Sequence, residues 1–215
     1  MTKKLLYIGF AFLLVLLAAG IYWSLNSSVD SARPVSAAVP THSAAPDPRV
    51  EKVEQLLYEL EVNGGNGSRA GKTYLLTQPD LNAFLAARLR EEDRKGVEDI
   101  KVELRDGSFI TRVLLNMDEL EVEGNSMALG LFQALLSGKQ NLEVEGELTA
   151  RDGKGSYRVL SARMNNISVP ATLVNTLLST AGKNQEPPFD PTEPFEMPYG
   201  IKTVKVQTGR VTIST

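Results

Sequence analysis

The sequence contains no cysteine, and only one histidine and one tryptophan, among its 215 residues. Without cysteine the chain can form neither a disulfide nor a thiolate nucleophile. The histidine, His42, lies in a stretch without an apolar period, where a solvent-exposed side chain is expected. Ser–His–Asp, Cys–His and zinc sites all depend on these residue types, so we expect none of them in this chain.

Basic residues are also few, with 23 Lys and Arg against 26 Asp and Glu and a formal net charge of −3. Nucleic-acid-binding proteins need basic clusters that displace counterions, so we expect no nucleic-acid partner. The many acidic residues leave open a carboxylate pair for glycoside hydrolysis, but no motif supports one. We predict that the protein is not an enzyme and requires neither a cofactor nor a metal.

A glycine-rich stretch at residues 63–73 suggests a nucleotide-binding loop at first sight. That motif requires a glycine, four further residues and then Gly-Lys-Ser/Thr. Counting back from Gly71, Lys72 and Thr73 places Asn66 where the first glycine should stand. We interpret the stretch as a turn, with Lys72 as a solvated side chain.

The most prominent feature that is present is the apolar run at residues 5–23, which carries no charge. A run of about 20 apolar residues can span a bilayer as a helix. Two lysines precede it and Tyr22 and Trp23 end it, as expected for a cytoplasmic N-terminus and a membrane–water interface. We predict that residues 1–24 are a single-pass signal anchor in the cytoplasmic membrane. A cleaved signal peptide is the alternative, although its apolar region is usually only about 7–15 residues long.

The rest of the chain divides into two parts. Residues 25–47 are dominated by Ser, Ala and Pro and cannot bury enough surface to offset the entropy lost on ordering, so we predict a flexible tether. Residues 48–215 are long enough for one domain with a sizeable core. The predicted topology of the anchor places this domain outside the cytoplasm.

Three segments of the domain have the apolar spacing of amphipathic helices. The first covers residues 48–62, and the second covers residues 78–93. Thr77 and Asp80 stand at the spacing typical of a helix start and mark the beginning of this second helix. The third helix begins at Pro170. The apolar stripes of the three helices are Val50, Val53, Leu56, Leu57 and Leu60; Leu81, Phe84, Leu85 and Leu89; and Leu173, Val174, Leu177 and Leu178.

Alternating apolar and polar residues predict three β-hairpins, at residues 97–115, 142–165 and 201–213. The Asp-Gly pair at residues 106–107 is a strong turn signal for the first of them. The second carries a row of glutamates, which we interpret as the solvated face of a strand because a calcium site needs oxygen ligands converging from several segments. These glutamates are Glu143, Glu145 and Glu147.

Two segments fit neither pattern. Residues 127–136 are dense in apolar side chains and form either a short buried helix or a lip that faces lipid. Residues 184–198 contain five prolines, which block both a helix and a central strand. We predict an extended crossing there, with Phe189 and Phe195 as anchors.

The order of these elements resembles a group of single-anchored bacterial envelope proteins that are grouped loosely with TULIP-type lipid-binding domains. The resemblance covers residues 74–215 and depends on LTQPDLNAFL at residues 76–85 and VPATLVNTLL at residues 169–178. It implies a curved antiparallel sheet wrapped around one or two helices, with an apolar groove between them. For the whole domain we predict an α+β fold in which this sheet packs on two or three helices. The resemblance implies no catalytic residue.

We expect the stripes of the second and third helices to line this groove. The leading hypothesis is that the domain binds an apolar ligand, such as a lipid, near the membrane. If the same residues are closed core, the alternative is a structural or assembly partner that presents a sheet edge or the Phe189–Phe195 segment to another envelope protein. The predicted ligand-binding residues are Leu81, Phe84, Leu85, Leu89, Leu173 and Leu177.

Overall fold

The computed structural model describes residues 47–64, 71–91, 96–119, 137–183 and 190–215. The predicted anchor at residues 5–23, the tether up to residue 46 and the apolar segment at residues 127–136 lie outside these ranges. Among the described residues, no helix has the length and apolarity needed to cross a membrane.

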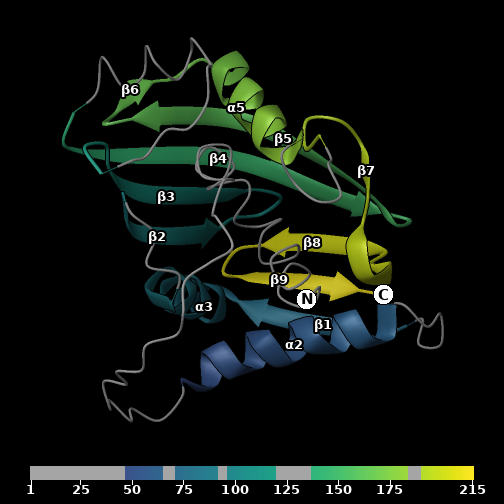
Figure 1. Cartoon of the computed structure of the whole chain (residues 1–215). Helices are drawn as coiled ribbons and strands as arrows, with labels where there is room; N and C mark the ends of the chain where they lie inside the picture. Colours follow the sequence, from purple (N-terminus) through teal and green to yellow (C-terminus); the bar gives the residue numbers. More distant parts are fainter. Residues whose placement is uncertain (1–46, 65–70, 92–95, 120–136, 184–189) are drawn as a thin grey trace, which may run out of the picture.

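The domain is α+β, with a strongly curled antiparallel sheet and helices at both ends of it (Figure 1). This confirms the predicted fold class for the domain. The described helices are α2 (Pro48–Gly64), α3 (Gln78–Glu91), α5 (Ala171–Lys183) and the short 3-10 helix η1 (Pro198–Gly200). The strands are β1 (Thr73–Thr77), β2 (Val97–Leu104), β3 (Phe109–Asn116), β4 (Lys139–Arg151), β5 (Lys154–Met164), β6 (Ile167–Ser168), β7 (Phe195–Glu196), β8 (Thr203–Gln207) and β9 (Arg210–Ser214).

The long strand β4 organises the sheet. One edge pairs with β3 over its first half and with β8 at Ala150↔Val204, and the other edge pairs with β5. The path along the first edge therefore runs β1-β9-β8-β4-β3-β2. All three predicted hairpins are present, as β2–β3, β4–β5 and β8–β9.

The two ends of the domain sequence meet in the sheet. β1 pairs with β9 from Thr73↔Ser214 to Thr77↔Arg210. The backbone N–H of Gly71 also donates to the Thr215 carbonyl, and the Thr215 N–H donates to the Lys72 carbonyl. The second strand of the last hairpin thus connects the start of the domain to β8 and, through β8, to β4.

Helix α2 begins and packs as its sequence predicts. Asp47 accepts a hydrogen bond from the Arg49 N–H at 2.9 Å, and Pro48 occupies the first turn, where a missing N–H costs nothing. The helix contacts α3 and η1, and the predicted stripe faces inward. Its buried members are Val53, Leu56, Leu57 and Leu60.

Helix α3 begins with a reciprocal cap. The Asp80 carboxylate accepts a hydrogen bond from the Thr77 N–H at 2.9 Å, and the Thr77 hydroxyl accepts one from the Asp80 N–H at 3.4 Å. Lys52 of α2 lies 2.5 Å from the same carboxylate. Burial opposes ionisation of Asp80, but the hydrogen bonds from Lys52 and Thr77 outweigh it and hold the pKa of Asp80 below its ordinary value. The cap therefore also joins α3 to α2.

The lysine of the glycine-rich stretch has a partner. Lys72 Nζ lies 3.1 Å from a Glu59 carboxylate oxygen, and the hydrogen bond from Lys72 is the main reason that the pKa of Glu59 is lowered. The interpretation of Lys72 as simply solvated was therefore incomplete. Both side chains are about one-third exposed or more, so the pair contributes at most about 1 kcal/mol.

Two amide side chains of α3 cover the outer edge of β2. Asn82 accepts a hydrogen bond from the Val102 N–H at 2.7 Å and donates to the Val102 carbonyl at 3.0 Å. Gln78 accepts from the Leu104 N–H at 2.8 Å. These side chains take the place of a neighbouring strand, because each backbone group of an edge strand needs a partner.

We expect Asn82→Ala to lower the free energy of unfolding by about 2 kcal/mol, because both polar groups of Val102 lose their partners in a partly buried site. Urea unfolding followed by circular dichroism measures the change. Asn175→Ala, at an exposed asparagine of α5, is the matched control and should change stability by less than about 0.5 kcal/mol. Equal effects of the two substitutions would contradict the assigned role of Asn82.

Strand β5 contains a bulge that explains an irregularity of its sequence. Val159 and Leu160 are consecutive apolar residues, which breaks strict alternation. The pairing with β4 shifts at Glu145 and Gly146, so Leu160 is the extra residue of a β-bulge. Val159 is consequently buried, whereas Leu160 is 44% exposed.

Candidate functional site

The four strands β2, β3, β4 and β5 bury one face of the sheet, which we call the inner face. Cross-strand pairing sets its residues in rows, because directly paired residues project to the same side. One row runs Val102, Thr111, Val144 and Ala162. The flanking rows are Leu104, Phe109, Gly146 and Val159 on one side and Ile100, Val113, Leu142 and Met164 on the other.

The opposite, outer face of these strands is charged. Arg112 of β3 lies 2.8 Å from both Glu103 and Glu143, and Arg158 of β5 pairs with Glu147. The predicted glutamate row therefore lies on a partly exposed face beside arginines. The described residues contain no cluster of three His, Cys, Asp or Glu side chains that could hold a metal ion. Charge is thus segregated from the apolar inner face.

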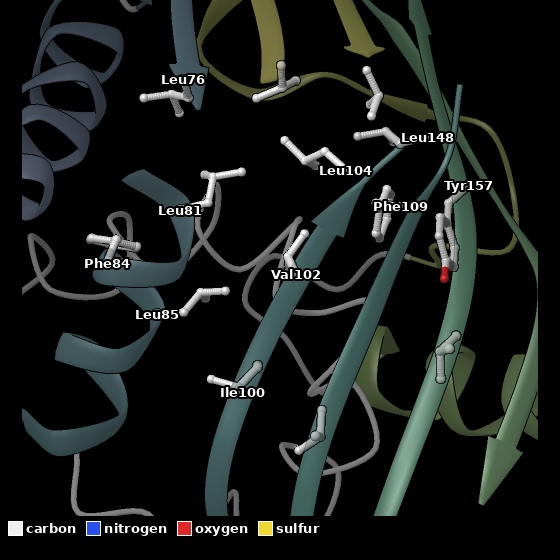
Figure 2. Packing of buried hydrophobic residues seen from close by; sticks show 14 of the residues in the cluster. Leu76, Leu81, Phe84, Leu85, Ile100, Val102, Leu104, Phe109, Leu148 and Tyr157 are labelled. Atoms are coloured by element: carbon white, nitrogen blue, oxygen red, sulfur yellow. The ribbon is translucent and has the colours of Figure 1, made fainter. Parts of the chain in front are cut away.

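Three of the predicted ligand-binding residues lie in the core beside β2. Leu81, Phe84 and Leu85 of α3 are all buried. Figure 2 shows Leu81 and Leu85 between α3 and the strand that carries Ile100 and Val102. Leu89 is partly buried against the same core. This part of the predicted site is filled by protein.

The other predicted residues belong to α5, at the opposite end of the four strands. α5 contacts β5, whereas α3 contacts β2, β1 and α2 (Figure 1). Among the described side chains of α5, Val174 and Leu178 are buried and Leu173 is half-buried, and the Leu177 side chain lies outside the described set. The structure therefore separates the six predicted residues into two groups, and a site that includes α5 lies along β5.

The aromatic centre of the inner face was not among the predicted site residues. Phe109 and Tyr157 stack with ring centroids 6.1 Å apart (Figure 2). The Tyr157 ring covers Gly146, so a side-chain carbon at Gly146 would lie less than 3.0 Å from the ring. A glycine inside a strand often marks such a close approach, and this was the one sequence signal for the arrangement.

Two hydroxyl groups on the inner face have no hydrogen-bond partner within the described structure. They are Thr111 Oγ1 and Tyr157 Oη, and both atoms are inaccessible to solvent. The Tyr157 phenol is neutral at pH 7 and remains a donor, and burial raises its pKa further above the ordinary value. Such groups are uncommon because an unpaired buried hydroxyl is destabilising.

A depression of about 480 Å³ opens between β5 and α5. Tyr157 and Val159 of the inner face contribute to its wall, together with the outer-face residues Glu147, Thr149, Ser156 and Arg158. A larger depression of about 920 Å³ lies at the end of β4, between the Asp106–Gly107 turn and β8. The smaller one is lined by Glu147, Thr149, Ser156, Tyr157, Arg158, Val159, Asn175, Thr192 and Pro194.

The geometry thus assigns the candidate site to the β5–α5 side of the inner face. Tyr157 and Val159 contribute apolar surface there, and Tyr157 also carries one of the two buried hydroxyl groups, whereas Thr111 lines neither of the two depressions. Comparison of the chain with models of protein families, with curated proteins and with solved structures gives no match.

Proposed function

We propose that the protein is a single-pass, membrane-anchored envelope protein whose extracytoplasmic domain binds an apolar ligand, such as a lipid, on the inner face of its curled sheet. One observation carries this proposal. Tyr157 and Val159 of the apolar inner face contribute to the wall of the depression between β5 and α5, beside the outer-face pair Glu147 and Arg158. Ligand pockets are typically concave and mostly apolar, with a few placed polar groups.

Features of the sequence support the proposed location. The apolar run at residues 5–23 is long enough to span a bilayer, and the lysines before it favour a cytoplasmic N-terminus. The resemblance to single-anchored envelope proteins agrees with this topology. A domain held on a short tether would remain close to the outer surface of the membrane and its lipids.

The proposal divides the six predicted ligand-binding residues by position. Leu81, Phe84 and Leu85 support the inner face from the β2 side, where they are buried by protein. Leu173, on α5, stands at the other end and is half-buried. We therefore place the ligand along β5 and α5, with the α3 residues as the packed base of the fold.

Native mass spectrometry of the full chain, purified in detergent, tests the proposal. We expect a co-purifying lipid that Asn175→Trp displaces, because this side chain lines the depression. Leu160→Trp adds the same ring at the exposed bulge of β5 and should leave the lipid bound. Lipid associated with the anchor would persist in both variants, so only the difference between them reports on the domain. Identical spectra for wild type and Asn175→Trp would contradict the proposal.

A second candidate function is an assembly partner, and one observation favours it. The outer edge of β5 pairs with β7 at Lys154 and Gly155 and with β6 at Arg163 and Met164. Between these contacts no described strand pairs with that edge, so an extended peptide of another envelope protein could add there. A lipid-free domain that captures such a protein would favour this function.

The phenylalanine segment offers less support for the assembly function than the sheet edge does. Phe195 belongs to β7, and its ring packs on Gly155 and the core. Phe189 lies outside the described residues. Phe195 therefore stabilises the domain and is not displayed as an anchor for a partner.

A further inference from the structure

We propose that the hydroxyl groups of Thr111 and Tyr157 hydrogen-bond an uncharged ester or amide carbonyl of the ligand, so that the domain selects acyl lipids over plain hydrocarbons and over free fatty acid anions. The inference rests on the proposed function and specifies its ligand. Both hydroxyls are buried on the inner face without a partner in the described structure.

The pairing register brings the two hydroxyls into neighbouring rows. The Tyr157 phenol extends from its own position on β5 over Gly146 of β4. Gly146 pairs with Phe109 of β3, and Thr111 is the next residue of β3 on the same face. The phenol oxygen is therefore directed along the sheet toward the row that contains Thr111, and Tyr157 itself also lines the depression beside α5.

The chemistry of the two groups indicates an acceptor in the ligand. A neutral phenol and an aliphatic hydroxyl each have one proton to donate. A phenol is protonated at neutral pH, and burial raises the pKa of Tyr157 further above its ordinary value. A carbonyl oxygen has two lone pairs and can accept both hydrogen bonds, which satisfies two groups that are otherwise unpaired.

The distribution of charge indicates that this acceptor is neutral. The rows of the inner face contain no basic side chain. Arg112 and Arg158 project to the outer face, where each pairs with a glutamate, and Arg158 reaches the depression from that face together with Glu147. A carboxylate on the inner face would be a buried charge without a cation, which is strongly unfavourable. An ester or amide carbonyl carries no such penalty.

The test compares three probes of equal chain length, namely an alkane, the methyl ester of the matching fatty acid and the fatty acid anion. Each is offered to the full chain in detergent, and complexes are counted by native mass spectrometry. We expect wild type to prefer the ester. Thr111→Val and Tyr157→Phe should each reduce ester binding about three- to ten-fold, as for one lost hydrogen bond, while alkane binding is unchanged.

Two controls isolate the hydroxyl groups. Thr111→Ser keeps the hydroxyl and should retain the ester preference, and Tyr58→Phe removes an exposed phenol of α2 without effect. In the ligand-free protein, Thr111→Val and Tyr157→Phe should raise the melting temperature by about 2–4 °C, because each removes an unpaired buried group. A lower melting temperature in both variants would show that the hydroxyls already have partners, such as buried water, and would overturn the inference.

The outcomes separate this inference from the proposed function. Equal binding of alkane and ester by wild type overturns the hydroxyl–carbonyl contact and leaves apolar ligand binding intact. A preference for the fatty acid anion overturns the assignment of a neutral group. Binding of none of the three probes contradicts the proposed function itself.

Discussion

Phe84→Ala is expected to lower the free energy of unfolding by about 3–5 kcal/mol, the range for truncating a buried phenylalanine. The Phe84 side chain is only 3% exposed, on a helix that packs against both β2 and α2. The Arg88 guanidinium lies 5.2 Å from the ring centroid and adds a cation–π contact that the variant also loses. Urea unfolding of wild type and variant, followed by circular dichroism, gives the difference.

Tyr58→Ala is the matched control for this prediction. Tyr58 is an aromatic residue on α2, but its side chain is 56% exposed, so its loss should cost less than about 0.5 kcal/mol. A cost below about 1 kcal/mol for Phe84→Ala would mean that protein does not bury the ring in solution. That result would restore α3 as a wall of the ligand groove.

Gly146→Ala is expected to cost about 3 kcal/mol, which is large for the addition of one methyl group. The new carbon would lie less than 3.0 Å from the Tyr157 ring, closer than real side-chain contacts allow. The ring cannot withdraw freely, because it stacks on Phe109 and is buried. The unfolding midpoint and the near-ultraviolet tyrosine signal should therefore both change.

A double-mutant comparison identifies the cause of this loss. In a Tyr157→Leu background the bulky ring is absent, so adding the methyl group at residue 146 should cost much less than in wild type. If the methyl group costs the same in both backgrounds, the effect arises from the β4 backbone and not from the aromatic contact.

Local elements of this domain could be predicted because their causes are local. The Asp106–Gly107 turn, the Thr77–Asp80 cap and the apolar stripe of α2 each depend on residues a few positions apart. The structure confirms these elements, and it confirms the curved antiparallel sheet that the resemblance implied. Some bounds differ from the predicted ones by a few residues, as at β4, which begins at Lys139 and not at Leu142.

The position of the candidate site could not be predicted, because an amphipathic stripe shows that a helix has an apolar face but not which strand it covers. α3 and α5 have similar stripes, yet one packs on β2 and the other on β5. The same limit applies to Thr111 and Tyr157. In the sequence they are ordinary strand residues, and only the register over Gly146 shows that their hydroxyls share one region.

The pairing of β1 with β9 has a consequence for the kinetics of folding. Contacts between residues far apart in sequence form slowly, because a long loop must close before the pairing contributes any stability. β1 and α3 are synthesised early, but β1 has no described strand partner other than β9, which follows every other described strand in the sequence. Until β9 emerges, β1 remains an unpaired strand that a chaperone or a neighbouring chain can bind. We therefore expect this end of the domain to form last during biosynthesis, after the local β2–β3 and β4–β5 hairpins.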